Sequence, residues 1–317
     1  MIMPASRALL PCAFALMLSA ACTPAPTEPS RAAPVTAIPA DPGTPSPSVA
    51  EILAASPADH WRTPDPGNLL YMDFPSGRVI IEMAPAFAPA HVENVSALTR
   101  EGYFQGGAVT RVQDNYVVQW AQALDPARPP KVGKEKLKAE FTRPRDGAVS
   151  FTVLPDPDTY APEVGFSDGF PAARDEKDMW LAHCYGTVGV GRDNDEDSGG
   201  GGELYAVIGQ SPRGLDRNIT VLGRVVQGME LLAALPRGTA DLGFYDEPGK
   251  FVRFADIRVA ADVPDAERTP LEILRTDSET FETLVNSRRW RRDDFYHRPV
   301  GRIGLCNINI PSRTPSP

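Results

Sequence analysis

Proline occupies 33 of the 317 positions, too many for a bundle of helices of this length. Because proline fixes φ and lacks a backbone N–H, it interrupts helix interiors and lies mostly at edges and ends of sheets. Eight of the prolines fall between residues 24 and 47, interleaved with Ala, Thr and Ser. Such a segment buries too little apolar surface to offset its ordering entropy, which predicts an extended tether. The other prolines must lie in loops and at strand ends.

The chain begins with the features of an export signal. Residues 8–21 are an apolar run of the length of a signal-peptide core, too short to span a bilayer. Cys22 follows small residues and resembles the lipidated cysteine of a bacterial lipoprotein; the alternative is ordinary cleavage beside an incidental cysteine. We therefore predict a signal peptide with a lipobox at 1–22 and a disordered, proline-rich tether at 23–66. Both alternatives export the protein to the periplasm or cell envelope, and lipidation would anchor it in the membrane.

The region 67–264 shows short strand-like runs separated by turn signals. Two such runs flank Pro75-Ser76-Gly77 and predict a hairpin. Helical spacing is confined to a segment that Pro89 opens and Gly102 closes, and to a short one at 228–235. Without alternation of strand and helix, the pattern predicts a mainly β domain, either a closed antiparallel barrel or a sandwich. The further strand-like runs are two pieces within 107–120 around the turn-prone Gln113-Asp114-Asn115, and single runs at 186–192, 203–209, 219–226 and 251–260.

Two further regions have less regular patterns. Residues 123–180 are rich in Pro and Asp and are predicted to be an elaborated loop with one or two strands. The C-terminal extension, 265–317, carries four arginines around Trp290, which we interpret as a solvated helix surface. The alternatives are contact with an anionic surface or with an assembly partner. Cys184 and Cys306 would form a disulfide in an oxidising compartment if the fold brought them together.

The overall charge and the candidate metal motifs exclude several functions. The chain has 32 basic and 41 acidic residues, a net charge of −9, which argues against binding nucleic acid. Asp193, Asp195 and Asp197 have the spacing that opens an EF-hand loop, but Ser198 and Leu204 replace its required glycine and glutamate. The histidines have no ligand partners at metal-binding spacing. We predict an acidic surface loop here, and neither a metal nor a cofactor.

Four motifs follow one another in a fixed order. They are VENVSAL with GYFQGG (92–107), VTRVQDNYVVQW (109–120), HCYGTVGVGR (183–192) and LDRNITVLGRVVQGME (215–230). Together they resemble the cyclophilin-type peptidyl-prolyl isomerases over about residues 68–262. The resemblance implies a closed eight-stranded antiparallel β-barrel with two capping α-helices, and proline-containing polypeptides as partners. It also implies a monomer that needs no cofactor.

The chemistry of such a site requires few groups. Rotation about an X–Pro bond crosses a barrier of about 18–20 kcal/mol and neither makes nor breaks a covalent bond. A donor to the twisted amide nitrogen and an apolar pocket for the proline ring are sufficient, and a rigid, always charged guanidinium suits the donor role. The resemblance makes Arg111 this catalytic group and Gln119 a ligand of the substrate backbone. The other implied substrate-binding residues are Tyr116, Val117, Gly191, Leu204, Tyr205 and Leu215.

Several positions depart from the family pattern. Thr110 replaces the histidine before the arginine, Trp120 begins the replacement of G-G-D after the glutamine, and Arg213-Gly214 occupy the place of a tryptophan. These changes predict a more polar pocket of different shape. The expected function is peptidyl-prolyl cis–trans isomerisation in exported proteins during their folding. The alternative is a catalytically weak or inactive peptide-binding or chaperone module of the cell envelope.

Overall fold

The computed structural model describes residues 37–123 and 127–315. The predicted signal segment, Cys22 and the first part of the tether lie outside the described residues. Among the residues that are described, no helix is long and apolar enough to cross a membrane. The helices are α1 (Val49–Ala54), α2 (Pro89–Arg100), α3 (Met229–Ala233) and α4 (Glu279–Arg289).

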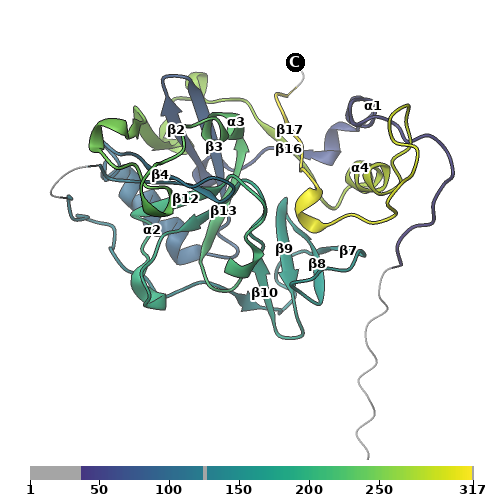
Figure 1. Ribbon diagram of the computed structural model, residues 1–317, viewed down its shortest axis with the longest axis horizontal. Helices are drawn as coiled ribbons and strands as arrows, with labels where there is room; N and C mark the ends of the chain where they lie inside the picture. The colour runs from purple at the N-terminus through teal and green to yellow at the C-terminus, as the bar shows by residue number, and fades with distance from the viewer. Residues whose placement is uncertain (1–36, 124–126, 316–317) are drawn as a thin grey trace, which may run out of the picture. The chain divides into compact units, whose positions relative to one another are not determined.

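The strands are antiparallel and form three sheets (Figure 1). The largest has nine strands in the order β14 (Val252–Arg253), β4 (Ala108–Val112), β5 (Val117–Ala121), β12 (Glu203–Val207), β11 (Thr187–Val190), β13 (Val221–Gln227), β3 (Gly77–Met83), β2 (Leu69–Phe74) and β15 (Asp256–Val259). The second has the order β6 (Arg143–Pro144), β10 (Asp178–Leu181), β9 (Phe170–Arg174), β8 (Glu163–Ser167) and β7 (Thr152–Leu154). The third comprises β1 (Trp61–Arg62), β16 (Glu272–Leu274) and β17 (Ser312–Arg313).

The nine-stranded sheet differs from the expected closed barrel of eight strands. The run at 251–260 was predicted as one strand, but it divides at Phe254, whose ring is buried in the core. Its first part, β14, pairs with β4 at one edge, and its second part, β15, pairs with β2 at the other. Two neighbouring segments, β14 and β15, therefore form the two edge strands of the sheet. No hydrogen-bonded ladder joins β14 to β15 within the described chain. The mainly β class is confirmed, whereas the closed eight-stranded barrel is not.

The main core lies between one face of the nine-stranded sheet and α2. Helix α2 begins with Pro89 at its first turn and ends before Gly102, which has the positive φ of +73° typical of a C-terminal cap. Its buried apolar residues are Val92, Val95 and Leu98. The sheet residues that share this core include Val118, Trp120, Leu204 and Ala206. Because side chains alternate along a strand, the residues between them lie on the opposite, outer face.

Residues 143–181 form a five-stranded sheet, where we had predicted an elaborated loop with one or two strands over 123–180. All five strands of the second sheet come from residues 143–181. Strands β8 and β9 form a hairpin through Asp168-Gly169, both with positive φ, and Asp-Gly is a common hairpin turn. Proline and aspartate interrupt these short strands, so the local pattern was too weak to predict them.

The C-terminal extension and residues 49–62 pack on this second sheet. Residues 49–62 were assigned to the disordered tether, but they form α1, which contacts α4, and β1, which pairs with β16 (Figure 1). Arg289 was interpreted as solvated, yet it is 1% exposed and paired with Asp156. Cys184 and Cys306 form the anticipated disulfide. The extension is therefore part of the folded structure, because its apolar residues complete a core with β7–β10.

Candidate active site

Four of the predicted site residues meet on the outer face of the nine-stranded sheet. The ladder places Arg111 of β4 beside Gln119 of β5, and Gln119 beside Tyr205 of β12. Val117 pairs with Val207 two residues further along. Strand alternation thus gathers side chains that are far apart in the sequence on one surface, away from the core.

Arg111 is held by three hydrogen bonds. Its Nε donates to the carbonyl oxygen of Leu242 at 2.7 Å, and one terminal nitrogen donates to Gln119 Oε1 at 2.8 Å. The other terminal nitrogen donates to Gln113 Oε1. The guanidinium carbon lies 5.7 Å from the ring centre of Tyr116 and 5.2 Å from that of Phe244. Burial lowers the pKa of Arg111, but a guanidinium keeps its charge in proteins, so a preorientated cation lies at the centre of this face.

Gln119 connects Arg111 to a carboxylate. Its amide nitrogen donates to Glu203 Oε1, while its amide oxygen accepts from Arg111. These two partners fix the orientation of the amide, since each selects one end of it. Glu203 was not predicted as a site residue. Its position two residues before Tyr205 on the same strand would have placed it on the same face.

A small apolar cluster lies next to the polar groups. Val117, Tyr205 and Val207 are buried, and Tyr116 and Ile219 pack against them half-buried. The ring of Tyr205 lies over Gly189 of β11, where an added Cβ would be 2.3 Å from the ring. Only glycine leaves space for this ring. Ile219 was missed, although it precedes β13 in the last motif.

A buried hydrogen-bonded chain supports Tyr205 from behind. The Tyr205 hydroxyl lies 2.9 Å from His183 Nε2, and His183 Nδ1 lies 3.0 Å from Asp216 Oδ1. Arg213 joins Asp216 at 2.5 Å and Asp158 at 3.0 Å. His183 is fully buried, so the polar atoms of its ring need their hydrogen-bond partners within the protein. His183 lies in the third motif, but we had given it no role.

The charge states of these hydrogen-bonded side chains are set by their burial and by the groups that they contact. Burial raises the pKa of Tyr205, which stays a neutral donor. Burial alone would raise the pKa of Asp216, but the hydrogen bonds from His183 and the charge of Arg213 lower it below its ordinary value. An ionised Asp216 selects the His183 tautomer with the proton on Nδ1, which leaves Nε2 to accept from Tyr205.

The remaining predicted residues lie elsewhere. Leu204 is 1% exposed in the main core, on the opposite face of β12 from Tyr205, because neighbouring residues alternate between faces. The prediction that Leu204 forms part of the proline pocket is therefore wrong. Leu215 is half-buried at the end of a short 3-10 turn, η4 (Arg213–Leu215), directly before Asp216. Gly191 lines a neighbouring cavity rather than the apolar cluster.

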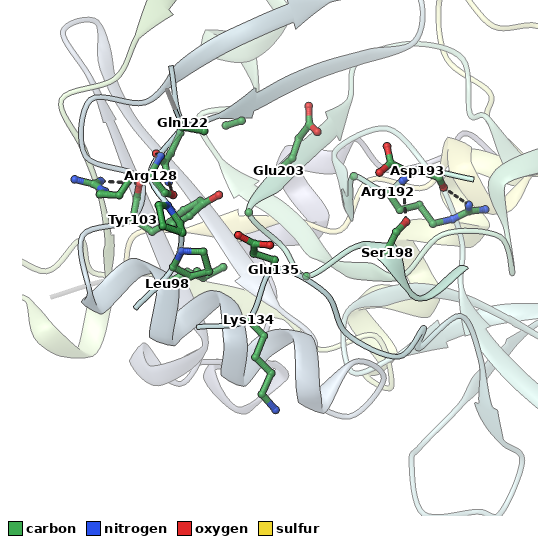
Figure 2. Close-up of a pocket in the computed structure, with 17 residues that line it drawn as sticks. Leu98, Tyr103, Gln122, Arg128, Lys134, Glu135, Arg192, Asp193, Ser198 and Glu203 are labelled. Carbon is green, nitrogen blue, oxygen red and sulfur yellow. Dashed lines mark hydrogen bonds between the residues drawn. The ribbon is translucent and has the colours of Figure 1, made fainter. Parts of the chain in front are cut away.

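This neighbouring cavity has a volume of about 350 Å³ and contacts Glu203. Figure 2 shows Tyr103, Gln122 and Arg128 at one end and Arg192, Asp193 and Ser198 at the other, with Glu135 and Glu203 between them. Charged groups of both signs line it, so it differs in character from the apolar cluster. The acidic loop that follows β11 therefore forms a wall of this cavity.

The fold and this face define an antiparallel β protein with an arginine-centred site beside an apolar cluster. The family model described as cyclophilin type peptidyl-prolyl cis-trans isomerase/CLD matches residues 69–259. Probable peptidyl-prolyl cis-trans isomerases of Brucella suis biovar 1 and Brucella abortus are each 25% identical over 207 residues, covering 65% of this chain and 88% of theirs. The crystal structure of cyclophilin AquaCyp293 from Hirschia baltica matches with a TM-score of 0.65 and 26% identity, over 80% of this chain and 92% of that one. The chain belongs to the cyclophilin-type peptidyl-prolyl isomerase family.

Proposed function

We propose that the outer face of β4, β5 and β12 accelerates the isomerisation of X–Pro bonds, with Arg111 as the catalytic residue. The observation that carries this proposal is the fixed guanidinium beside an apolar cluster. Three of the five N–H groups of a guanidinium are engaged at Arg111 within the described residues, so two are left for a substrate. When the amide twists, its nitrogen loses resonance and becomes an acceptor. A donor that bonds only this twisted form lowers the barrier.

The proline ring fits the cluster of Val117, Tyr205 and Ile219. This cluster is apolar, with Tyr116 and Ile219 partly exposed, and the hydrogen bond to His183 holds Tyr205 in one position. Gln119, orientated by Arg111 and Glu203, lies where it would bind the substrate backbone. With the ring and the backbone held, rotation is confined to the bond between them.

The cellular setting that we propose follows from the N-terminus. The apolar run before Cys22 supports export to the periplasm or cell envelope and anchoring through a lipid on Cys22. The Cys184–Cys306 disulfide agrees with an oxidising compartment. The substrates would then be proline-containing exported polypeptides during folding, and the protein would act as a monomer.

The test is the rate at which a short X–Pro peptide interconverts between cis and trans, followed by exchange NMR. Arg111→Ala removes a charge-assisted donor worth about 1.5–3 kcal/mol, which predicts a loss of about 10- to 150-fold in catalysed rate. Arg100→Ala is the matched control, because Arg100 is the last residue of α2, pairs with Asp262, and has a side chain that is 52% exposed. Equal rates for wild type and Arg111→Ala would contradict the assignment. Peptide binding without any acceleration would favour a chaperone module.

A further inference from the structure

We propose that residues 242–244, here called the Leu242–Phe244 strip, form a second substrate-binding surface that prefers an apolar side chain next to the X–Pro bond. This inference rests on the proposed function of Arg111. The strip belongs to the connection between α3 and β14, and no motif of the sequence pointed to it. It would determine which proline-containing sequences the protein prefers, whereas the Tyr205 cluster would hold the proline itself.

The strip lies beside the proposed catalytic residue, on the side of β4 that faces away from β5. Its Leu242 carbonyl accepts from Arg111 Nε at 2.7 Å, and Phe244 forms an antiparallel bridge with Arg111. Gln119 and the apolar cluster lie on the other side, across the ladder from β4 to β5. A peptide bound with its proline in the cluster and its amide over Arg111 would therefore place a flanking residue at the strip.

The backbone of the strip is fixed to β4 at both ends. Gly238 N donates to the Val112 carbonyl, and Tyr245 N donates to the Thr110 carbonyl, both at 3.0 Å. The Tyr245 ring is buried in the main core, and its hydroxyl donates to the carbonyl of Pro236 at 2.6 Å. The strip is thus a preformed surface, and its ordering costs nothing when a peptide binds.

Packing does not explain the residues that the strip presents. Leu242 is 65% exposed and Phe244 is 38% exposed, so neither contributes a full apolar side chain to the core. Leu242 also has a φ of +57°, a conformation that is strained for a leucine. Glycine or asparagine would form the same turn more easily. Strain and exposure coincide at the residue whose carbonyl holds Arg111, which points to a role in binding.

The chemistry of the strip indicates an apolar ligand group. The Phe244 ring lies 5.2 Å from the Arg111 guanidinium carbon, and Leu242, two residues earlier, has an exposed aliphatic side chain. A leucine or phenylalanine of the substrate would bury both surfaces, whereas glycine would bury neither. We therefore propose that the strip binds a branched aliphatic or aromatic residue of the substrate that directly precedes or follows the proline.

The test compares peptides that carry leucine or glycine before the proline, and leucine or glycine after it. The readout is the ratio of kcat/KM between leucine and glycine peptides, because Phe244 also flanks Arg111 and its loss changes every rate. We expect the wild type to prefer leucine at one of the two positions. Phe244→Ala should reduce that ratio about fivefold, the effect of about 1 kcal/mol of lost apolar contact. Leu242→Gly should also reduce it while leaving the protein at least as stable, because the backbone strain is relieved.

The matched control is Phe295→Ala, which removes a phenylalanine that is 81% exposed and outside the site. No leucine preference in the wild type, a ratio unchanged in both strip variants, or an equal reduction in Phe295→Ala would overturn the inference. If Arg111→Ala shows that catalysis was wrongly assigned, the same ratio can be taken from peptide dissociation constants by NMR titration. The strip is then tested independently of the reaction.

Discussion

Tyr205 is the residue on which the apolar cluster depends. Its ring needs the space left by Gly189, and its hydroxyl needs His183. A phenylalanine would keep the ring but leave His183 Nε2 buried without its partner, which costs about 1–3 kcal/mol. The polar groups therefore lie mainly behind the ring, whereas the surface that we propose for proline is apolar.

The hydrogen-bonded side chains behind Tyr205 predict a specific dependence of the protein's stability on pH. The folded pKa of Asp216 is below its ordinary value of 3.8, so the unfolded chain binds this proton more readily. The resulting stabilisation is complete above the ordinary pKa and is lost as the pH falls through the folded pKa. Asp216→Asn should have a lower free energy of unfolding than wild type at neutral pH. This difference between the two proteins should become smaller as the pH falls towards about 3. Urea unfolding of both proteins across this pH range measures the difference in free energy of unfolding. A difference that does not change with pH would contradict the role of the carboxylate.

At the scale of elements, local signals predicted some parts of the fold and missed others. The β2–β3 hairpin, the β4–β5 pair and α2 each carry their own turn or cap residues, and all were predicted. The break at Phe254 depends on two sheet edges that are distant in the sequence, so no local pattern shows it. Arg111, Gln119 and Tyr205 were found through motifs. Phe244 was not, because it follows 133 residues after Arg111 and only the fold brings them together.

A buried ion pair connects α4 to the end of β7. Asp156 accepts from Arg289 and from the backbone N–H of Ile303, and both side chains are at most 2% exposed. Asp156→Ala would leave the Arg289 charge buried without a partner, which should lower the free energy of unfolding by about 3–5 kcal/mol. The control is Asp262→Ala, which breaks an exposed pair with Arg100 and should cost less than about 1 kcal/mol. Equal losses in urea unfolding would show that the buried pair has no special role.

At the scale of the whole molecule, the second sheet and the C-terminal extension are joined to the site from behind. The Cys184–Cys306 disulfide attaches the extension to the residue that follows His183. Arg213 connects Asp216 to Asp158, which lies between β7 and β8. The sequence raised the disulfide only as a possibility and did not indicate the contacts of Arg213, because each connection joins segments that only the fold brings together. The second sheet and the C-terminal extension therefore support the residues behind the apolar cluster.

The central claim is that Arg111 acts on the twisted amide and not on the ground state of the peptide. The most direct measurement determines the catalysed exchange rate and the peptide dissociation constant in the same NMR samples, for wild type and Arg111→Lys. A lysine keeps the charge but loses the fixed planar geometry of the donors. We expect the exchange rate to fall at least tenfold while the dissociation constant changes less than about threefold. An equal loss of catalysed exchange rate and of peptide affinity in Arg111→Lys would contradict this role of Arg111. A lysine variant as fast as wild type would also contradict it.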